Sequence, residues 1–292
     1  MSTFEVYTVD AFTDKPFYGN PAAVVLLKSD IEDSFKQKIA SEIKLSETAF
    51  VLCKNVNDFV SENEFYIRWF TPSNEVPLCG HATLASAAVL FYRKKNKNKL
   101  SFETMGGDEL HVELENDGYI SMNFPHNPTD NLDKSLVDPA IEIAKAILPD
   151  LNKVLEFKFS PGTKKLLLRL DETKITSDDI LRIEPNCEEM LKVKSNDCIR
   201  GVIVTHKDLI KERYDFVSRY FSPWNGIPED PVNGSGHTAL APYWSDILAK
   251  KTLFAGVLSK RTGQLRLNYN EAKGRVSISG KACVVIEGLI NT

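Results

Sequence analysis

The sequence GHATLA at residues 80–85 returns as GHTALA at residues 236–241, an offset of 156 residues from 80 to 236. In both copies a glycine turn leads into an apolar run, which predicts the start of a buried helix. In the first copy the segment 82–92 is apolar on nearly every side, so we expect this helix inside a core.

Two further matches flank these turns. RWFTP at 68–72 is echoed by RYFSP at 219–223, and GYIS at 118–121 is echoed by GRVS at 274–277. Each match alone could arise by chance, but three in the same order at nearly constant offset indicate an internal duplication.

The duplication predicts an α+β protein of two similar lobes. Each repeat contains several short strands, one helix from the glycine turn and a hairpin, so we expect each lobe to be a curved sheet wrapped around that helix. We expect the first lobe to comprise residues 1–127, completed by a returning strand within 281–292, and the second to comprise residues 128–280. Pro242 should kink or break the second helix.

Composition narrows the class of function. The chain has 292 residues, 36 of them basic and 40 acidic, with a net charge of -4. This balance argues against a general binder of nucleic acid or anionic membranes. The five cysteines form no CxxC pair, and the N-terminal residues lack the basic and apolar segments of a signal peptide. These features predict a cytoplasmic protein without a disulfide framework or a structural zinc site.

A surface helix is expected near residues 29–43. Ser29 and Glu32 have the spacing of a capping box, and Ile31, Phe35, Ile39 and Ile43 recur every four residues. One apolar stripe of this kind is typical of a helix that covers a sheet.

The two glycine turns also supply candidate site residues, because the free N–H groups at a helix start can bind a carboxylate or phosphate. The first turn is surrounded by Glu75, Cys79, Gly80 and His81, and the second by Glu229, Asp230, Asn233, Gly234, Ser235 and Gly236. His81 and His237 are candidate general acids, or else first-turn residues bonded to their neighbours.

Glu47 comes directly before an apolar strand, in SETAFV at residues 46–51. Partial burial there would raise the pKa of its carboxyl group into the range useful for proton transfer. The alternative is a solvated glutamate at a strand end.

Several of these segments resemble those of a known protein family. SETAFV at 46–51, CGHAT at 79–83 and EDPVNGS at 229–235, together with the N-terminal stretch 4–27, are similar to the phenazine-biosynthesis isomerase (PhzF-like) family, relatives of diaminopimelate epimerase. The likeness runs along essentially the whole chain. It implies two pseudo-twofold-related lobes, each a mostly antiparallel sheet rolled around a central helix, and the family suggests a homodimer.

The resemblance also implies roles for particular residues. Glu47 would be the acid and base, with His81, Asp230 and Ser235 as polar partners, while Gly80 and Gly234 lend backbone to a substrate carboxylate. The related epimerases carry a cysteine at both turns. In this chain Cys79 and Gly236 are also expected to bind the substrate. The repeat places Ser235 at the position where the epimerases have their second thiol.

A serine hydroxyl is a far weaker base than a thiolate, which disfavours a two-thiol epimerisation. We therefore expect a cofactor-independent isomerase, in which Glu47 moves a proton within a small cyclic or amino-acid-like carboxylate in a cleft between the lobes. The alternatives are an amino-acid epimerase or racemase using Cys79 and Glu47, and a catalytically silent binding protein on the same fold. No motif indicates a cofactor or a metal.

Overall fold

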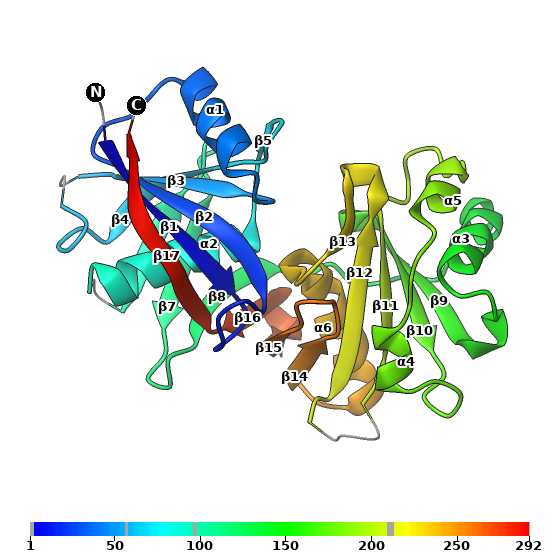
Figure 1. Cartoon of the computed structure of the whole chain (residues 1–292). Coiled ribbons are helices and arrows are strands. Elements are labelled where there is room, and N and C mark those ends of the chain that lie inside the picture. Colours follow the sequence, from blue (N-terminus) through cyan, green and yellow to red (C-terminus); the bar gives the residue numbers. More distant parts are fainter. Residues whose placement is uncertain (1–2, 56–57, 96–97, 209–212, 292) are drawn as a thin grey trace. The chain divides into compact units, whose positions relative to one another are not determined.

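The computed structural model describes residues 3–55, 58–95, 98–208 and 213–291. The chain forms two compact lobes (Figure 1). The described residues up to Asn123 and from Ile278 onward form the first lobe, and Phe124–Ser277 form the second. The chain passes from one lobe to the other between residues 123 and 124 and returns between 277 and 278. The boundaries expected from the sequence were 127/128 and 280/281.

The first lobe contains nine strands and three helical segments among its described residues. The boundaries between the lobes fall inside two strands, β8 and β16, so each of these has residues in both lobes. The elements of the first lobe are β1 (Thr3–Ala11), β2 (Asn20–Leu27), α1 (Asp33–Ile43), β3 (Thr48–Cys53), β4 (Glu64–Phe70), β5 (Glu75–Val76), α2 (Gly80–Ala88), the π-helical turn η1 (Val89–Arg93), β6 (Lys99–Glu103), β7 (Glu109–Leu114), β8 (Ile120–Pro125) and β17 (Ala282–Asn291).

The second lobe follows between β8 and β17. Its elements are α3 (Lys134–Ile147), η2 (Leu151–Lys153), β9 (Val154–Ser160), η3 (Pro161–Thr163), β10 (Lys165–Leu170), α4 (Ser177–Leu181), α5 (Cys187–Lys192), β11 (Gly201–Lys207), β12 (Phe216–Ser222), η4 (Pro223–Asn225), β13 (Ile227–Asp230), α6 (Gly234–Leu248), β14 (Thr252–Val257), β15 (Gly263–Asn270), η5 (Glu271–Lys273) and β16 (Arg275–Gly280).

The two lobes share one strand order. In the first, β2 pairs antiparallel with β1 and parallel with β3, β4 pairs antiparallel with β3 and β5 and parallel with β6, and β7 follows β6. The second lobe repeats these pairings, with the strands β9 to β15 in the places of β1 to β7. The match confirms the duplicated fold. β17 pairs along the whole of β1, as Figure 1 shows.

Each sheet wraps around the helix that follows a glycine turn. Every residue of α2 from His81 to Ala88 is buried, and this helix packs against β1, β2, β3 and β17. In the second lobe α6 packs against β14 and β15, and the run from Gly236 to Ser245 is buried. A helix that is apolar on every side requires such a core, so the sequence pattern predicted both helices correctly.

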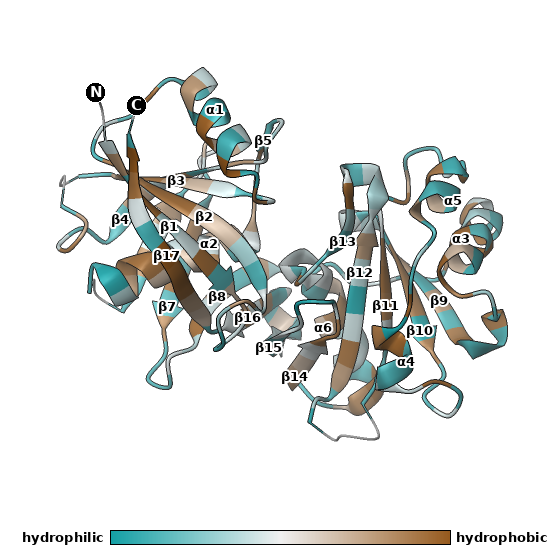
Figure 2. Ribbon diagram, viewed as in Figure 1, coloured by the Kyte–Doolittle hydropathy of each residue, from teal (hydrophilic) through white to brown (hydrophobic). Residues whose placement is uncertain are grey.

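The surface helix α1 is also present, but its capping differs from the expectation. Ile39 is buried, and Ile31, Phe35 and Ile43 pack around it in a cluster on the outer side of the sheet, so α1 carries both hydropathy colours in Figure 2. The predicted capping box at Ser29 is wrong. The helix begins at Asp33, and its N-cap, Glu32, makes no side-chain capping hydrogen bond.

Pro242 does not break α6, which continues to Leu248. A proline has no N–H to donate to the carbonyl four residues earlier, here that of Thr238. The N–H of Asn127 donates to this carbonyl instead, at 3.0 Å, and Nδ2 of Asn127 donates to Oγ1 of Thr238 at 2.9 Å. The helix therefore tolerates Pro242 because a neighbouring segment satisfies the freed carbonyl.

Among the described residues, no helix combines the length and the apolar character that crossing a membrane requires.

Candidate active site

Glu47 lies where the chain enters β3. The N–H of Ala23 on β2 donates to the carbonyl of Glu47 at 3.1 Å, and Ala23 stands opposite Thr48 in the parallel pair β2–β3. The sheet therefore fixes the backbone of Glu47. Its side chain is 13% exposed, so the partial burial expected for this carboxylate is present.

Cys79 and His81 lie at the start of α2. Cys79 is the N-cap residue in an extended conformation, and its side chain makes no capping hydrogen bond. Its Sγ lies 3.4 Å from Nδ1 of His81, and both side chains are buried. Because no side chain caps α2, the N–H groups of its first turn are not used by the capping residue and can face a ligand.

The other ring nitrogen of His81 faces Glu47. Oε2 of Glu47 lies 3.2 Å from Nε2 of His81, and Oγ of Ser46 lies 3.4 Å from the same nitrogen. Within the described part of the chain, the buried Oε2 takes part in no hydrogen bond. A buried oxygen without a donor is costly, so this atom is a group that a ligand can satisfy.

The arrangement places an imidazole between a thiol and a carboxylate. In a neutral imidazole one nitrogen donates a hydrogen bond and the other accepts one. The three side chains are of the types that acid and base catalysis uses.

The same three side chains also raise the question of a metal. Their donor atoms all lie within 4.8 Å of one another, and zinc accepts all three ligand types. However, Cys79 and Glu47 make their closest approaches to different nitrogens of His81. The contacts therefore place the ring between its two partners. The absence of a metal stays a prediction.

Asn233 organises the start of α6 in the second lobe. As the N-cap residue, it accepts hydrogen bonds on Oδ1 from the N–H of Gly236 at 2.6 Å and from Oγ of Ser235 at 3.0 Å. Its Nδ2 donates to Oδ2 of Asp230 at 2.7 Å. These bonds gather three predicted site residues into one group, and they use the N–H of Gly236 internally.

The equivalence of Cys79 and Ser235 is only approximate in the structure. Cys79 precedes α2, whereas Ser235 lies inside the first turn of α6, which already begins at Gly234. The side chain of Asn233 caps this earlier start. The second lobe therefore presents a serine hydroxyl from a helical turn and not from a capping position.

Lys165 is a polar residue of this region that sequence reasoning missed. It is the first residue of β10 and is 6% exposed, and its Nζ donates to Oγ of Ser235 at 3.0 Å. Burial lowers the pKa of Lys165 to about 8, against an opposing effect of Asp230. The available signal was the repeat, because Lys165 begins the strand that corresponds to β2.

His237 is a core residue. Its Nδ1 lies 2.7 Å from the carbonyl of Asn233, and its ring stacks on Phe216 with centroids 6.1 Å apart. Burial lowers the pKa of His237 to about 4, so the ring is neutral near pH 7. The contacts therefore favour a first-turn residue bonded to its neighbour over a general acid.

The glutamates near the two turns bind arginines. Oε1 and Oε2 of Glu75 accept from Nε and Nη2 of Arg68, both at 2.7 Å. Glu229 binds Arg219 in the same two-pronged way, at 2.6 and 2.8 Å. These pairs fasten β5 to β4 and β13 to β12, which makes both glutamates structural.

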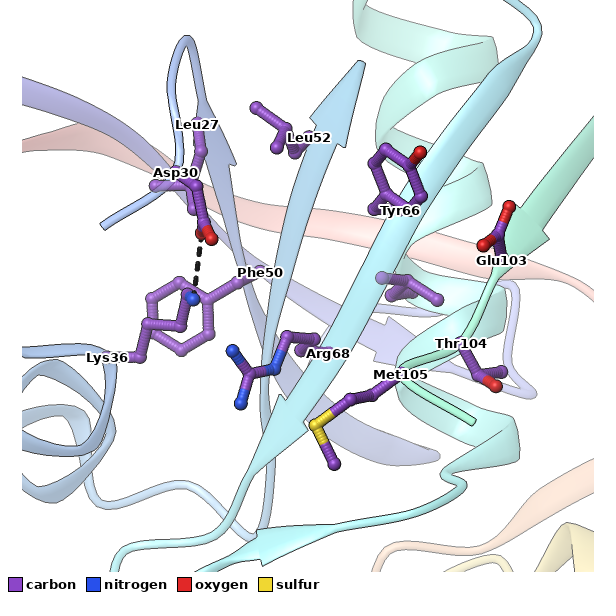
Figure 3. A pocket seen from close by; sticks show the side chains of 11 residues that line it. Leu27, Asp30, Lys36, Phe50, Leu52, Tyr66, Arg68, Glu103, Thr104 and Met105 are labelled. Carbon is purple, nitrogen blue, oxygen red and sulfur yellow. Dashed lines mark ion pairs between the residues drawn. The ribbon is translucent and has the colours of Figure 1, made fainter. Parts of the chain in front are cut away.

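A separate cavity of about 300 Å³ lies between α1 and the strands beside it (Figure 3). It is lined by Phe50, Tyr66 and Met105 among others, and Nζ of Lys36 pairs with Asp30 at 2.8 Å. Glu47 and the start of α2 do not line it. Its charges are already paired, so it is not the better candidate site.

The structure thus brings the predicted residues together in two groups, each within one lobe. Glu47, Cys79 and His81 meet at the start of α2, which begins at Gly80. Asp230, Ser235 and Gly236 meet through Asn233 at the start of α6, which begins at Gly234. That both groups act on one substrate in a cleft between the lobes stays a prediction, as does the homodimer.

The chain can now be compared with known proteins. A family model described as "Phenazine biosynthesis-like protein" matches residues 9–288. The chain is 44% identical over 290 residues to the "Phenazine biosynthesis-like domain-containing protein" of Bos taurus, with 98% of each chain covered. It is 38% identical to an "Uncharacterized isomerase" of Pseudomonas aeruginosa, again with 98% of each covered.

Solved structures agree. A phenazine biosynthesis protein of the PhzF family from Enterococcus faecalis is 33% identical, with a TM-score of 0.83 and complete coverage of both chains. A hydroxyproline epimerase from Agrobacterium vitis has the same fold at 9% identity, with a TM-score of 0.55 and coverage of 99% and 92%. The model match and the identity over nearly the whole length show that the chain belongs to the phenazine biosynthesis-like (PhzF) family of isomerase-type proteins.

Proposed function

We propose that the chain is a cofactor-independent isomerase that moves a proton within a small cyclic or amino-acid-like carboxylate, with Glu47 as acid and base. The observation that carries the proposal is the buried Oε2 of Glu47, which lies 3.2 Å from Nε2 of His81 and, among the described residues, takes part in no hydrogen bond. A base held in this way is positioned by the sheet and still has an oxygen to offer to a substrate.

The proposed reaction has two steps. Glu47 takes a proton from an activated carbon of the substrate, and the negative charge that develops is stabilised by the N–H groups of the first turn of α2 and by the positive end of the helix. Glu47 then returns the proton to a different carbon. His81 positions the carboxylate from one side throughout.

The first experiment is a screen for proton exchange. Small cyclic and amino-acid carboxylates are incubated with the protein in deuterated water, and deuterium uptake is measured by mass spectrometry. Glu47→Gln keeps the size of the side chain but removes the base, so uptake should fall by about 10²- to 10⁴-fold. Glu42→Gln, on the exposed side of α1, is the matched control and should exchange like wild type. Equal uptake in the two variants would overturn the proposal.

A second candidate is an epimerase in which Cys79 and Glu47 act as two bases. The contact of 3.4 Å between Sγ of Cys79 and Nδ1 of His81 favours it, because an imidazole can take the proton of a neighbouring thiol. In that case alkylation of Cys79 should abolish exchange, and substrate should protect the thiol. Exchange that survives complete alkylation excludes this candidate.

A further inference from the structure

The register of the two sheets identifies corresponding positions in the two lobes. In the first, Thr48 on β3 stands opposite Phe70 on β4, and in the second Val202 on β11 stands opposite Phe221 on β12. Phe70 and Phe221 occupy the same place in the repeated motif RWFTP and RYFSP. Thr48 and Val202 therefore correspond.

The residue before each of these is the one of interest. In the first lobe it is Glu47, and in the second it is Gly201, which has no side chain. A side chain added there would have to displace Tyr220, because its Cβ would collide with the phenol. The second lobe has its polar group on the neighbouring strand, since Lys165 on β10 stands opposite Gly201.

Lys165 reaches the helix start of its own lobe as Glu47 reaches α2. Its Nζ donates to Oγ of Ser235 in the first turn of α6, and it lies 5.3 Å from the ring centre of Tyr220. Among the described residues, no carboxylate lies within ion-pair distance of this ammonium group. A buried cation beside the positive end of a helix is unfavourable unless an anion offsets it, and Asp230, which opposes the effect of burial on the pKa of Lys165, forms no ion pair with it.

We propose that Lys165 is a substrate-binding residue of the second lobe, whose ammonium group holds a carboxylate of the substrate beside the first turn of α6. The inference deepens the proposed function and depends on it only for the substrate being a carboxylate. It adds a selective role, because a neutral analogue would leave the buried ammonium group unpaired.

The charge of Lys165 depends on pH near neutrality. The groups that face it are Asp230 from β13 and Tyr220 from β12, with the hydroxyl of Ser235 from α6. Burial raises the pKa of Tyr220 to about 12, so its phenol stays neutral. Since the pKa of Lys165 is lowered to about 8, its cation is present below that pH and lost above it. The affinity for a carboxylate should therefore fall as the pH rises from 6.5 to 9.5.

The test uses benzoate as the probe and protein labelled with nitrogen-15 glycine. The amide resonance of Gly234 should shift saturably with benzoate at pH 6.5, and Lys165→Met should weaken this binding about tenfold to a hundredfold, the range for a charge-assisted hydrogen bond. Lys260→Met, on an exposed loop, should have no effect. Lys165→Arg keeps its charge at pH 9.5 and should bind benzoate there when wild type does not.

Unchanged affinity in folded Lys165→Met, or equal affinity of wild type at the two pH values, would overturn the inference. Glu47→Gln distinguishes it from the proposed function. That variant should lose deuterium exchange and still show the full benzoate shift at Gly234, so each proposal can fail while the other stands.

Discussion

At the scale of single residues, Glu47 and His81 come from different elements, and each is fixed by its own. Glu47 is held by the parallel pair β2–β3, and His81 by the first turn of α2. Their side chains approach to 3.2 Å because the start of β3 and the start of α2 lie close together in the first lobe. The contact of His81 with Cys79 follows from the start of α2, where both residues lie.

The other helix-start histidine gives a prediction about stability. Since burial lowers the pKa of His237 to about 4, the unfolded chain binds a proton at this residue between pH 6.5 and 4 that the folded chain does not. Stability should therefore fall on acidification through this window. From pH 7 to pH 5 the residue should account for a loss of about 2 kcal/mol.

His237→Asn keeps a donor for the carbonyl of Asn233 but cannot titrate. Its free energy of unfolding, measured in urea at both pH values, should change less between pH 7 and pH 5 than that of wild type, whatever the absolute loss from the smaller side chain. An identical pH dependence in the two proteins would contradict the assignment.

The sequence named three first-lobe residues that the structure brings together, and it missed Lys165 for a physical reason. Glu47, Cys79 and His81 belong to local motifs that name them directly. A lysine at the first position of a strand is ordinarily exposed, whereas Lys165 is 6% exposed, stands between β9 and β11 in the sheet and donates to Ser235 on α6. Burial of this kind depends on contacts distant in sequence, which no local pattern reports.

At the scale of elements, the duplication offers two versions of one ion pair in different surroundings. The side chain of Arg219 is 3% exposed, and besides Glu229 it donates to the carbonyls of Ile180 and Ile183. That of Arg68 is 18% exposed, and one of its carboxylate partners, Asp33, is largely in solvent. The Arg–Glu pair of the second lobe should therefore contribute more to the free energy of unfolding than that of the first.

We expect Arg219→Met to cost about 3–5 kcal/mol, because it leaves two buried carbonyls and the carboxylate of Glu229, which is 17% exposed, without their donor. Arg68→Met should cost about 1 kcal/mol, since water reaches its partners. Urea unfolding of the two variants measures the difference. A larger loss for Arg68→Met would show that burial does not decide the strength of these pairs.

Helix starts were harder to predict than helices. The apolar pattern identified α2 and α6, but α6 begins at Gly234, ahead of the repeated GHTALA motif, because Asn233 caps it. Pro242 was expected to kink or break α6 and does not break it, because Asn127 donates to the freed carbonyl of Thr238. In both cases one side chain or one neighbouring segment outweighed the local pattern.

At the scale of the whole molecule, one ancestral topology is used twice with different polar residues. The first lobe places a thiol, an imidazole and a carboxylate at its helix start, and the second places an amide, a hydroxyl and an ammonium group there. The repeat was visible in the sequence because packing requires the same apolar positions in both lobes. The polar groups that differ between the lobes, such as Glu47 and Lys165, were not visible in this way, because they lie at the starts of strands that do not correspond.

The return of the chain to the first lobe also gives a prediction. β17 pairs along all of β1, and Ile290 packs on the cluster that holds α1. Deleting the chain from Ala282 onward should therefore lower the melting temperature by more than about 10 °C. Deleting only the last two residues is the control and should leave it unchanged. A wild-type melting temperature in the longer deletion would mean that β17 is dispensable to this lobe.

The most direct test of the central claim compares Glu47→Gln with Cys79→Ser on one exchanging substrate. If Glu47 carries the proton, Glu47→Gln should reduce kcat/KM by about 10²- to 10⁴-fold, with little change in ligand affinity, and Cys79→Ser should be much milder. If Cys79→Ser abolishes exchange while Glu47→Gln stays near wild type, the single-carboxylate mechanism is contradicted and the thiol is the base.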